Sequence, residues 1–299
     1  MIKFTEIQKS LGSKIESNDD LACIVGWSAK DITEKTGIEK RFISTCSETA
    51  ESLAVEACKK ISEKHLNSLD LIISVTNTQK IEFPSIANIV HSELNLNKKI
   101  KCLGINAGCT GFVDAVELVY SYFQSEFASK ALIINSDTYS KYLNNERSTR
   151  TLFSDGATAT IVERDPNGFL IDKKIHSSVV KTYEFLKKEN INKEARIYMN
   201  GPQVLKFAMG TVLKDLINIM PEKESFLFPH QAGKLVLDII EKKANKKMTI
   251  FKNYSDYGNL VSASLPNLMK ENFEYLEKDI IILSGFGVGL AHNCLVLKK

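Results

Sequence analysis

The sequence predicts an α/β protein made of two similar halves packed together. Apolar runs typical of buried strands alternate with segments of helical periodicity along the whole chain. The order helix, strand, Phe-Pro-X, helix, strand, polar motif, helix, strand occurs twice, with Phe-Pro-Ser at 83–85 and Phe-Pro-His at 228–230. We therefore expect one half over residues 1–165 and another over 166–299, with equivalent strand ends facing a shared pocket.

The elements expected in the first half follow from apolar periodicity and helix-start signals. A first strand is followed by two short helices that begin near Asp19 and Ser28, and Gly37 ends the second of them. The remaining elements are helix Thr49–His65, strand Leu69–Val75, a helix from Ser85 through Leu94, strand Ile100–Ile105, helix Phe112–Phe123, strand Ala131–Ser136 and strand Ala157–Val162. The first strand spans Ile2–Ile7.

The second half begins with a polar, lysine-rich stretch. We interpret Gly168–Ala195 as a surface excursion with one strand and one short helix, because its apolar pattern is weak. The elements after it are helix Pro202–Met220, strand Ser225–Phe228, helix Ala232–Lys243, strand Met248–Phe251, helix Val261–Asn272, and strands Ile280–Ser284 and Cys294–Leu297.

Composition limits the classes of function. A hydrophobic content of 43% and a charged content of 25% are typical of a globular protein, and a net charge of +3 is too small to indicate nucleic-acid binding. The N-terminus lacks a signal-peptide pattern, and no apolar run is long enough to cross a bilayer. We expect a cytoplasmic protein with free thiols and no metal site, because the six cysteines are scattered. They are Cys23, Cys46, Cys58, Cys102, Cys109 and Cys294.

The chain is organised around Cys109 in the run Ile-Asn-Ala-Gly-Cys-Thr-Gly-Phe at 105–112. This run joins a strand to a helix, so the cysteine lies at a helix N-terminus, where backbone N–H groups favour an anion. We expect a thiol biased toward the nucleophilic thiolate. The alternative is an inert, buried core cysteine, which is the usual state of a free thiol.

Two loops of the second half are candidates to act with this thiol. His230 and Asn259 each lie where a strand gives way to a helix, and the duplication brings both loops toward Cys109. The glycine-rich run 284–289 leads into a strand, not a helix, so it does not fit a dinucleotide loop. We expect it to present the Val288 N–H, which would form an oxyanion hole with the N–H of Cys109.

These motifs together resemble the β-ketoacyl-(acyl carrier protein) synthase III family of the thiolase superfamily. The matching runs are Asn-Ala-Gly-Cys-Thr-Gly-Phe at 106–112, Pro-His-Gln-Ala at 229–232, Gly-Asn at 258–259 with Ser-Ala-Ser-Leu-Pro at 262–266, Phe-Ser-Asp-Gly-Ala at 153–157 and Lys-Thr-Gly-Ile at 35–38. The resemblance implies a thiolase-like duplicated fold, with five αβαβα layers and two mixed sheets. It also implies a decarboxylating Claisen condensation of an acyl-CoA or acyl carrier protein primer with a malonyl thioester, through acyl-Cys109, with His230 and Asn259 stabilising the enolate.

The resemblance assigns further residues to substrate binding. Arg147 matches an arginine that stacks on the CoA adenine; the tryptophan that accompanies it falls near Asp31, with Trp27 close by, and Lys35 stands where an arginine is common. Phe83 matches a residue that reaches into a neighbouring subunit's acyl pocket, which implies a homodimer. Lys206, Lys242 and Lys243 match positions that dock the acyl carrier protein. No cofactor is implied beyond the thioester substrates.

Other functions fit parts of this pattern. A relative in a secondary pathway would use an unusual primer, or would transfer the acyl group to another acceptor without decarboxylation. A catalytically silent, carrier-binding subunit is the alternative outside catalysis. The sequence leaves open the primer's length and identity, and the effect of the short region 166–196.

Overall fold

Two five-stranded mixed sheets form the frame of the computed structural model, which describes residues 1–191, 194–244 and 246–299. The first sheet contains, in spatial order, β1 (Ile2–Leu11), β7 (Gly156–Arg164), β6 (Lys130–Asp137), β4 (Leu71–Val75) and β5 (Lys101–Ile105). The second contains β12 (Met248–Ile250), β11 (Ser225–Pro229), β13 (Ile280–Gly287), β14 (Ala291–Lys298) and β8 (Leu170–Ser178).

The two sheets share one pattern of strand directions. β4 runs parallel to β5 and β6, while β7 and β1 are antiparallel to their neighbours. In the second sheet β11 runs parallel to β12 and β13, while β14 and β8 are antiparallel to theirs. The two orders are therefore equivalent strand for strand: β4 corresponds to β11, β5 to β12 and β1 to β8.

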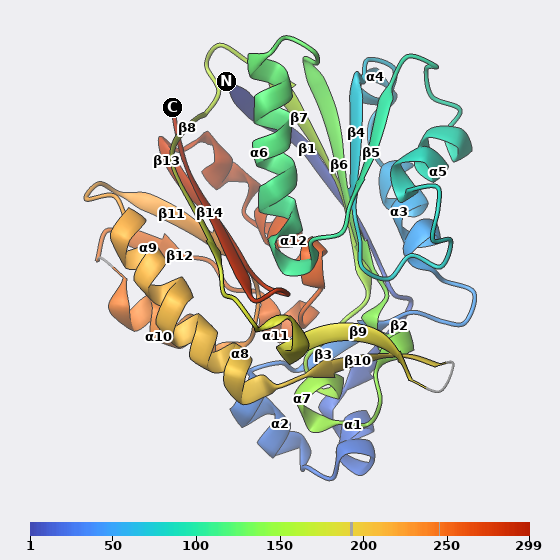
Figure 1. The fold of residues 1–299 in the computed structure, drawn as a ribbon, viewed down its shortest axis with the longest axis vertical. Helices are drawn as coiled ribbons and strands as arrows, with labels where there is room; N and C mark the ends of the chain where they lie inside the picture. Colours follow the sequence, from blue (N-terminus) through green and yellow to red (C-terminus); the bar gives the residue numbers. More distant parts are fainter. Residues whose placement is uncertain (192–193, 245) are drawn as a thin grey trace.

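Helices complete five layers (Figure 1). The helices α6 (Gly111–Gln124) and α12 (Ser264–Glu271) lie between the sheets, where their apolar faces share one core with both. The outer face of the first sheet is covered by α3 (Ala50–Cys58) and α5 (Ile86–Glu93). The outer face of the second is covered by α8 (Gly201–Phe207), α9 (Leu213–Ile219) and α10 (Lys234–Lys243). This arrangement confirms the predicted five-layer fold with two mixed sheets.

Short elements gather at the end of the molecule where the parallel strands finish (Figure 1). They are α1 (Asn18–Val25), α2 (Ala29–Thr36), α7 (Arg147–Arg150), α11 (Tyr254–Tyr257), the strand pair β2 (Lys14–Ser17) and β3 (Lys40–Ile43), and the hairpin β9 (Leu186–Ile191) and β10 (Glu194–Met199). Capping boxes at Ser17 and Ser28 begin α1 and α2, and Gly37 ends α2 as expected.

The interpretation of Gly168–Ala195 as a surface excursion is wrong in part. It contains β8, which completes the second sheet, and most of the β9–β10 hairpin; residues 192–193 lie outside the described part of the chain. β8 is an edge strand with several exposed lysines, so it lacks the apolar alternation that identifies a strand. The duplication itself calls for it, because β8 is the counterpart of β1.

Two predicted helices depart from a regular α-helix. Thr49–His65 divides into α3 and α4 (Glu63–Leu66), separated by a turn at 59–62. Pro202–Met220 forms one continuous helical segment in which Ala208–Val212 takes a π-helical turn between α8 and α9. In the described part of the chain, the helices are all too short or too polar to cross a membrane.

Candidate active site

Three loops from the two sheets converge on one cavity of about 360 Å³, called the main cavity here. Cys109 lies in a single 3-10 turn, Gly108–Thr110, between β5 and α6. His230 directly follows β11, and Asn259 lies between α11 and α12. All three side chains are buried and line this cavity, so the expectation that equivalent loops meet at a common point is confirmed for these residues.

The Cys109 thiol is not biased toward the thiolate, contrary to the sequence expectation. Burial raises its pKa to about 12, and the nearby Asp137 carboxylate adds to the increase. The backbone N–H groups of Val288 and of Cys109 itself hydrogen-bond the sulfur and lower the pKa, but by less. The helix start therefore supplies donors to the sulfur, yet the resting group is a neutral thiol.

Two glycines let the backbone approach the sulfur. Gly108 has φ +53°, and a Cβ there would lie 2.7 Å from Asn77 Oδ1 and 2.8 Å from Val288 Cγ2. Gly287 has φ +153°, and a Cβ there would lie 3.0 Å from the Cys109 sulfur. The run 284–289 therefore packs against the nucleophile from the second sheet, which places the Val288 amide at the thiol.

His230 is held as a neutral imidazole. Its backbone N–H donates to the Ser284 carbonyl at 2.7 Å, and its ring meets the Phe286 ring edge-on with 5.4 Å between centroids. Burial lowers the pKa of His230 to about 3. Its Nδ1 is buried without a hydrogen-bond partner among the described residues, so no contact at this nitrogen selects a tautomer.

Asn259 is fixed on both its backbone and its carboxamide. Its N–H donates to Leu152 O at 2.9 Å, and its Oδ1 accepts from the Val261 N–H at 2.9 Å. Val261 has φ +56°, an unfavourable conformation for a β-branched residue, and this turn directs its N–H to that oxygen. The carboxamide NH₂ is left facing His230, with Nδ2 3.3 Å from Nε2.

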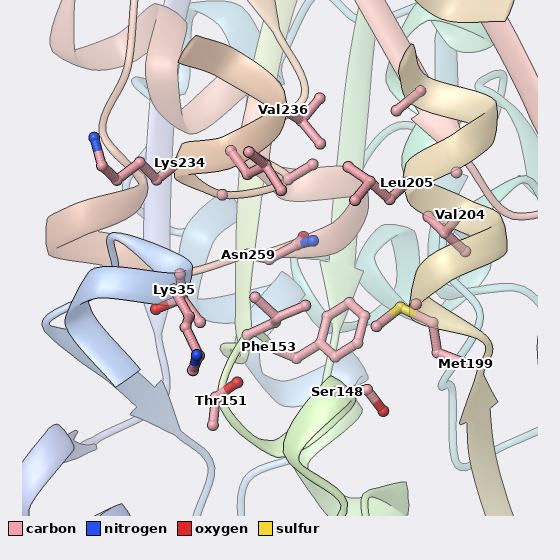
Figure 2. Close-up of a pocket in the computed structure, with 18 of the residues that line it drawn as sticks. Lys35, Ser148, Thr151, Phe153, Met199, Val204, Leu205, Lys234, Val236 and Asn259 are labelled. Atoms are coloured by element: carbon pink, nitrogen blue, oxygen red, sulfur yellow. The ribbon is translucent and has the colours of Figure 1, made fainter. Parts of the chain in front are cut away.

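The rest of the main cavity is mostly apolar. Figure 2 shows Val204 and Leu205 of α8 and Val236 of α10 around Asn259, with Phe153 and Met199 beside it. This lining suits a flexible chain that carries few charges.

Three of the predicted substrate-binding residues lie together in the wall of the main cavity: Trp27, Lys35 and Arg147. The Lys35 ammonium and the Arg147 guanidinium each lie 5.3 Å from the centre of the Trp27 ring. Arg147 also donates to the carbonyls of Val25 and Gly26. Asp31, near which the resemblance places the tryptophan, forms the capping box with Ser28. Trp27 is the residue that lies beside Arg147 instead.

The other predicted binding residues lie apart from these. Phe83 is 84% exposed and lines neither the main cavity nor the second chamber described below. Lys206 lies exposed on α8, next to the cavity-lining Leu205; Lys242 and Lys243 lie exposed in the last turn of α10.

Sequence reasoning missed a second chamber of about 300 Å³, lined by Asn77, Tyr139 and Val288 among others. It also missed Asp137, which is fully buried at the end of β6 and accepts hydrogen bonds from Asn77 N, Thr78 Oγ1 and Ser262 Oγ. Burial raises the pKa of this carboxyl to about 6, against those bonds. A Ser-Asp pair at the carboxyl end of a buried strand was the available signal.

The chain is similar to proteins of one family in sequence and in structure. Residues 103–179 match the model of 3-oxoacyl-(acyl-carrier-protein) synthase III, and residues 217–299 match its C-terminal model. The beta-ketoacyl-(acyl-carrier-protein) synthase III of Clostridium botulinum is 34% identical over 303 residues, covering 93% of this chain and 92% of that protein. The protein of the same name from Neisseria gonorrhoeae is 30% identical, covering 94% of each. The crystal structure of the synthase III of Aquifex aeolicus superposes with a TM-score of 0.89 at 30% identity over the full length of both chains.

Proposed function

This chain belongs to the 3-oxoacyl-(acyl-carrier-protein) synthase III family, and we propose that it performs the family's condensation through an acyl group carried on Cys109. The observation that carries the proposal is the meeting of Cys109, His230 and Asn259 on one cavity from three separate loops. The reaction is an acyl transfer of fatty acid biosynthesis: a primer thioester and malonyl carrier protein give a 3-oxoacyl carrier protein, carbon dioxide and the free thiol of the primer's carrier.

The first half-reaction moves the primer onto Cys109. Because the resting thiol is neutral, it must lose its proton as it attacks the thioester carbonyl, and the neutral His230 lines the same cavity as an acceptor. The new S–C bond forms, the primer's C–S bond breaks, and the proton passes to the departing thiolate. The amides of Cys109 and Val288 would stabilise the carbonyl oxygen as its charge develops.

The second half-reaction breaks the carboxyl C–C bond of the malonyl group. The electron pair moves into an enolate, whose oxygen would accept hydrogen bonds from Asn259 Nδ2 and His230 Nε2, the two nitrogens that lie 3.3 Å apart. Both donors are neutral, so they stabilise the oxygen without protonating the carbon. That carbon attacks the acyl-Cys109 carbonyl: a C–C bond forms, the C–S bond breaks, and Cys109 leaves as a thiolate that takes up a proton to restore the resting thiol. Each step uses only side chains and backbone amides of this chain.

Substrate docking follows from the cavity mouth. The cluster of Trp27, Lys35 and Arg147 offers an aromatic face and two cations to the nucleotide of an acyl-CoA. The exposed Lys206, Lys242 and Lys243 lie on the two helices that line the cavity, and they suit an acidic carrier protein.

The proposal includes a cytoplasmic homodimer. The exposed Phe83 and the edge strand β5 support a second copy at this side of the first sheet. The six cysteines are all free, in keeping with a reducing compartment.

The test is intact-protein mass after incubation with acyl-CoAs or acyl carrier proteins, followed by malonyl carrier protein. We expect an acyl mass gain that Cys109→Ser abolishes, and discharge of that acyl group with release of carbon dioxide. Cys46→Ser, which removes an exposed thiol, is the control and should keep the gain.

Two results would contradict the proposal. An acyl group that malonyl carrier protein does not discharge would indicate an acyltransferase with another acceptor. Absence of any mass gain across the donors would indicate a silent, carrier-binding subunit.

A further inference from the structure

The second chamber adjoins the main cavity near the turn that carries the nucleophile. Leu186 lines both it and the main cavity, while Val288 lines the chamber and Gly287 the main cavity. Asn77 Oδ1 and the Val288 side chain also lie so close to Gly108 that a Cβ there would clash with both. An acyl group on Cys109 therefore has the chamber as its neighbour when the main cavity is filled by the incoming thioester.

Several polar groups interrupt the mostly apolar wall of the chamber. Asn77 and Tyr139 contribute their side chains, with Tyr139 Oη donating to Asn77 Oδ1 at 3.3 Å. Thr78 Oγ1 and the Asn77 N–H both donate to Asp137, and Asn106 Oδ1 accepts from Asn77 Nδ2. These groups hydrogen-bond one another, so the contacts that a ligand could still gain in the chamber lie elsewhere along its wall.

A lysine completes the wall. Lys188 of β9 donates from Nζ to the Asn77 carbonyl at 2.6 Å, and its ammonium lies 4.6 Å from the centre of the Tyr142 ring. Burial lowers the pKa of Lys188, while the carboxylates of Asp137 and Glu82 raise it. The neighbouring Lys187 instead forms an ion pair with Glu189 at 2.8 Å. Lys188, by contrast, contacts a backbone carbonyl and an aromatic ring.

We propose that the second chamber selects short primers whose far end carries a carboxylate, held by Lys188 with the polar side chains of Asn77 and Asn106 around it. This inference rests on the proposed function, because it concerns the acyl group carried by Cys109. A carboxylate would accept charge-assisted hydrogen bonds from the ammonium and would neutralise it. An alkyl end of the same length would leave Lys188 partly desolvated and without a new partner.

The test compares two primers of equal carbon number. Succinyl-CoA and butyryl-CoA are offered to the full chain, singly and in competition, and the rate of Cys109 acylation is followed by intact mass. We expect succinyl transfer to be faster by about tenfold or more, the effect of one charge-assisted hydrogen bond. Equal rates, or faster butyryl transfer, would overturn the inference and leave the proposed function standing. Transfer of neither primer, with no other donor active, would overturn both.

Variants assign the preference to the chamber. Lys188→Met should remove most of the succinyl advantage and raise the butyryl rate, because it replaces the ammonium by an apolar end of similar length. The matched control is Lys173→Met, which removes the same charge from the edge strand β8 and should keep the preference. If Lys173→Met lowers the succinyl advantage as much as Lys188→Met does, then net charge and not the chamber sets the rate.

Discussion

The main cavity and the second chamber share Leu186 in their walls, but different side chains line the rest of each. The main cavity is walled by apolar side chains such as Leu205 and Val236. The second chamber carries Asn77, Tyr139 and Lys188. Their key loops are related by the duplication, since Asn77 follows β4 and His230 follows the equivalent β11. We infer from this that one loop of the pair supports chemistry and that the other contacts the group that is transferred.

The largest expected effect concerns the catalytic side chains of the main cavity. Asn259→Ala removes a donor to the enolate, which forms only in the second half-reaction, so decarboxylation should fall by about 10²- to 10³-fold. Acylation of Cys109 should change far less, because the enolate is absent from it. Stopped-flow acylation and carbon dioxide release from malonyl carrier protein measure the two steps separately. Equal losses in both steps would contradict the enolate role; His230→Ala should also impair decarboxylation more than acylation.

The next effect concerns how the stability of the fold depends on pH. The folded-state pKa of His230, about 3, lies below its ordinary 6.5, so His230 makes the fold less stable as pH falls from 6.5. The pKa of Asp137, about 6, lies above its ordinary 3.8, so its contribution to stability is lost as pH rises through 6 and regained on acidification. Between pH 7 and pH 5 the two effects have opposite signs.

Urea unfolding of paired variants measures both effects. Relative to His230→Gln, the unaltered protein should lose about 2 kcal/mol of unfolding free energy between pH 7 and pH 5. Relative to Asp137→Asn it should gain about 1 kcal/mol over the same range. Parallel pH profiles for a variant and the unaltered protein would mean that the substituted group has the same pKa in the folded and the unfolded state, which would contradict the prediction.

The smallest effect separates substrate binding from primer choice. Leu205→Asp places a charge on the apolar wall of the main cavity, and it should raise the KM for acyl-CoA by about tenfold. The increase should be the same for succinyl and butyryl primers, because both are attached to the same CoA, which is the part expected to lie against this wall. Ile217→Asp, on the exposed side of α9, is the control and should leave KM unchanged. A change in the primer ratio would place Leu205 against the acyl group instead.

The sequence was sufficient for the parts of the site that local pattern determines. The strand–turn–helix at Cys109 and the turns at His230 and Asn259 follow from neighbouring residues and from the repeat. β8 was expected only as an unplaced strand of a surface excursion, because edge strands need no buried alternating face. The neutral state of Cys109 was missed because burial and Asp137 come from distant segments. The place of Trp27 beside Arg147 depends on how α1 and α2 pack, which spacing along the chain does not encode.

The shared strand order of the two sheets has an evolutionary consequence. After a duplication, two copies of every loop face the same reactive centre, and only one copy of each pair needs to keep the chemistry. In this chain the loop after β11 holds His230, whereas the loop after β4 contributes Asn77 and Thr78 to the second chamber. New primer preferences can then arise by drift in one copy while the reaction itself is inherited unchanged.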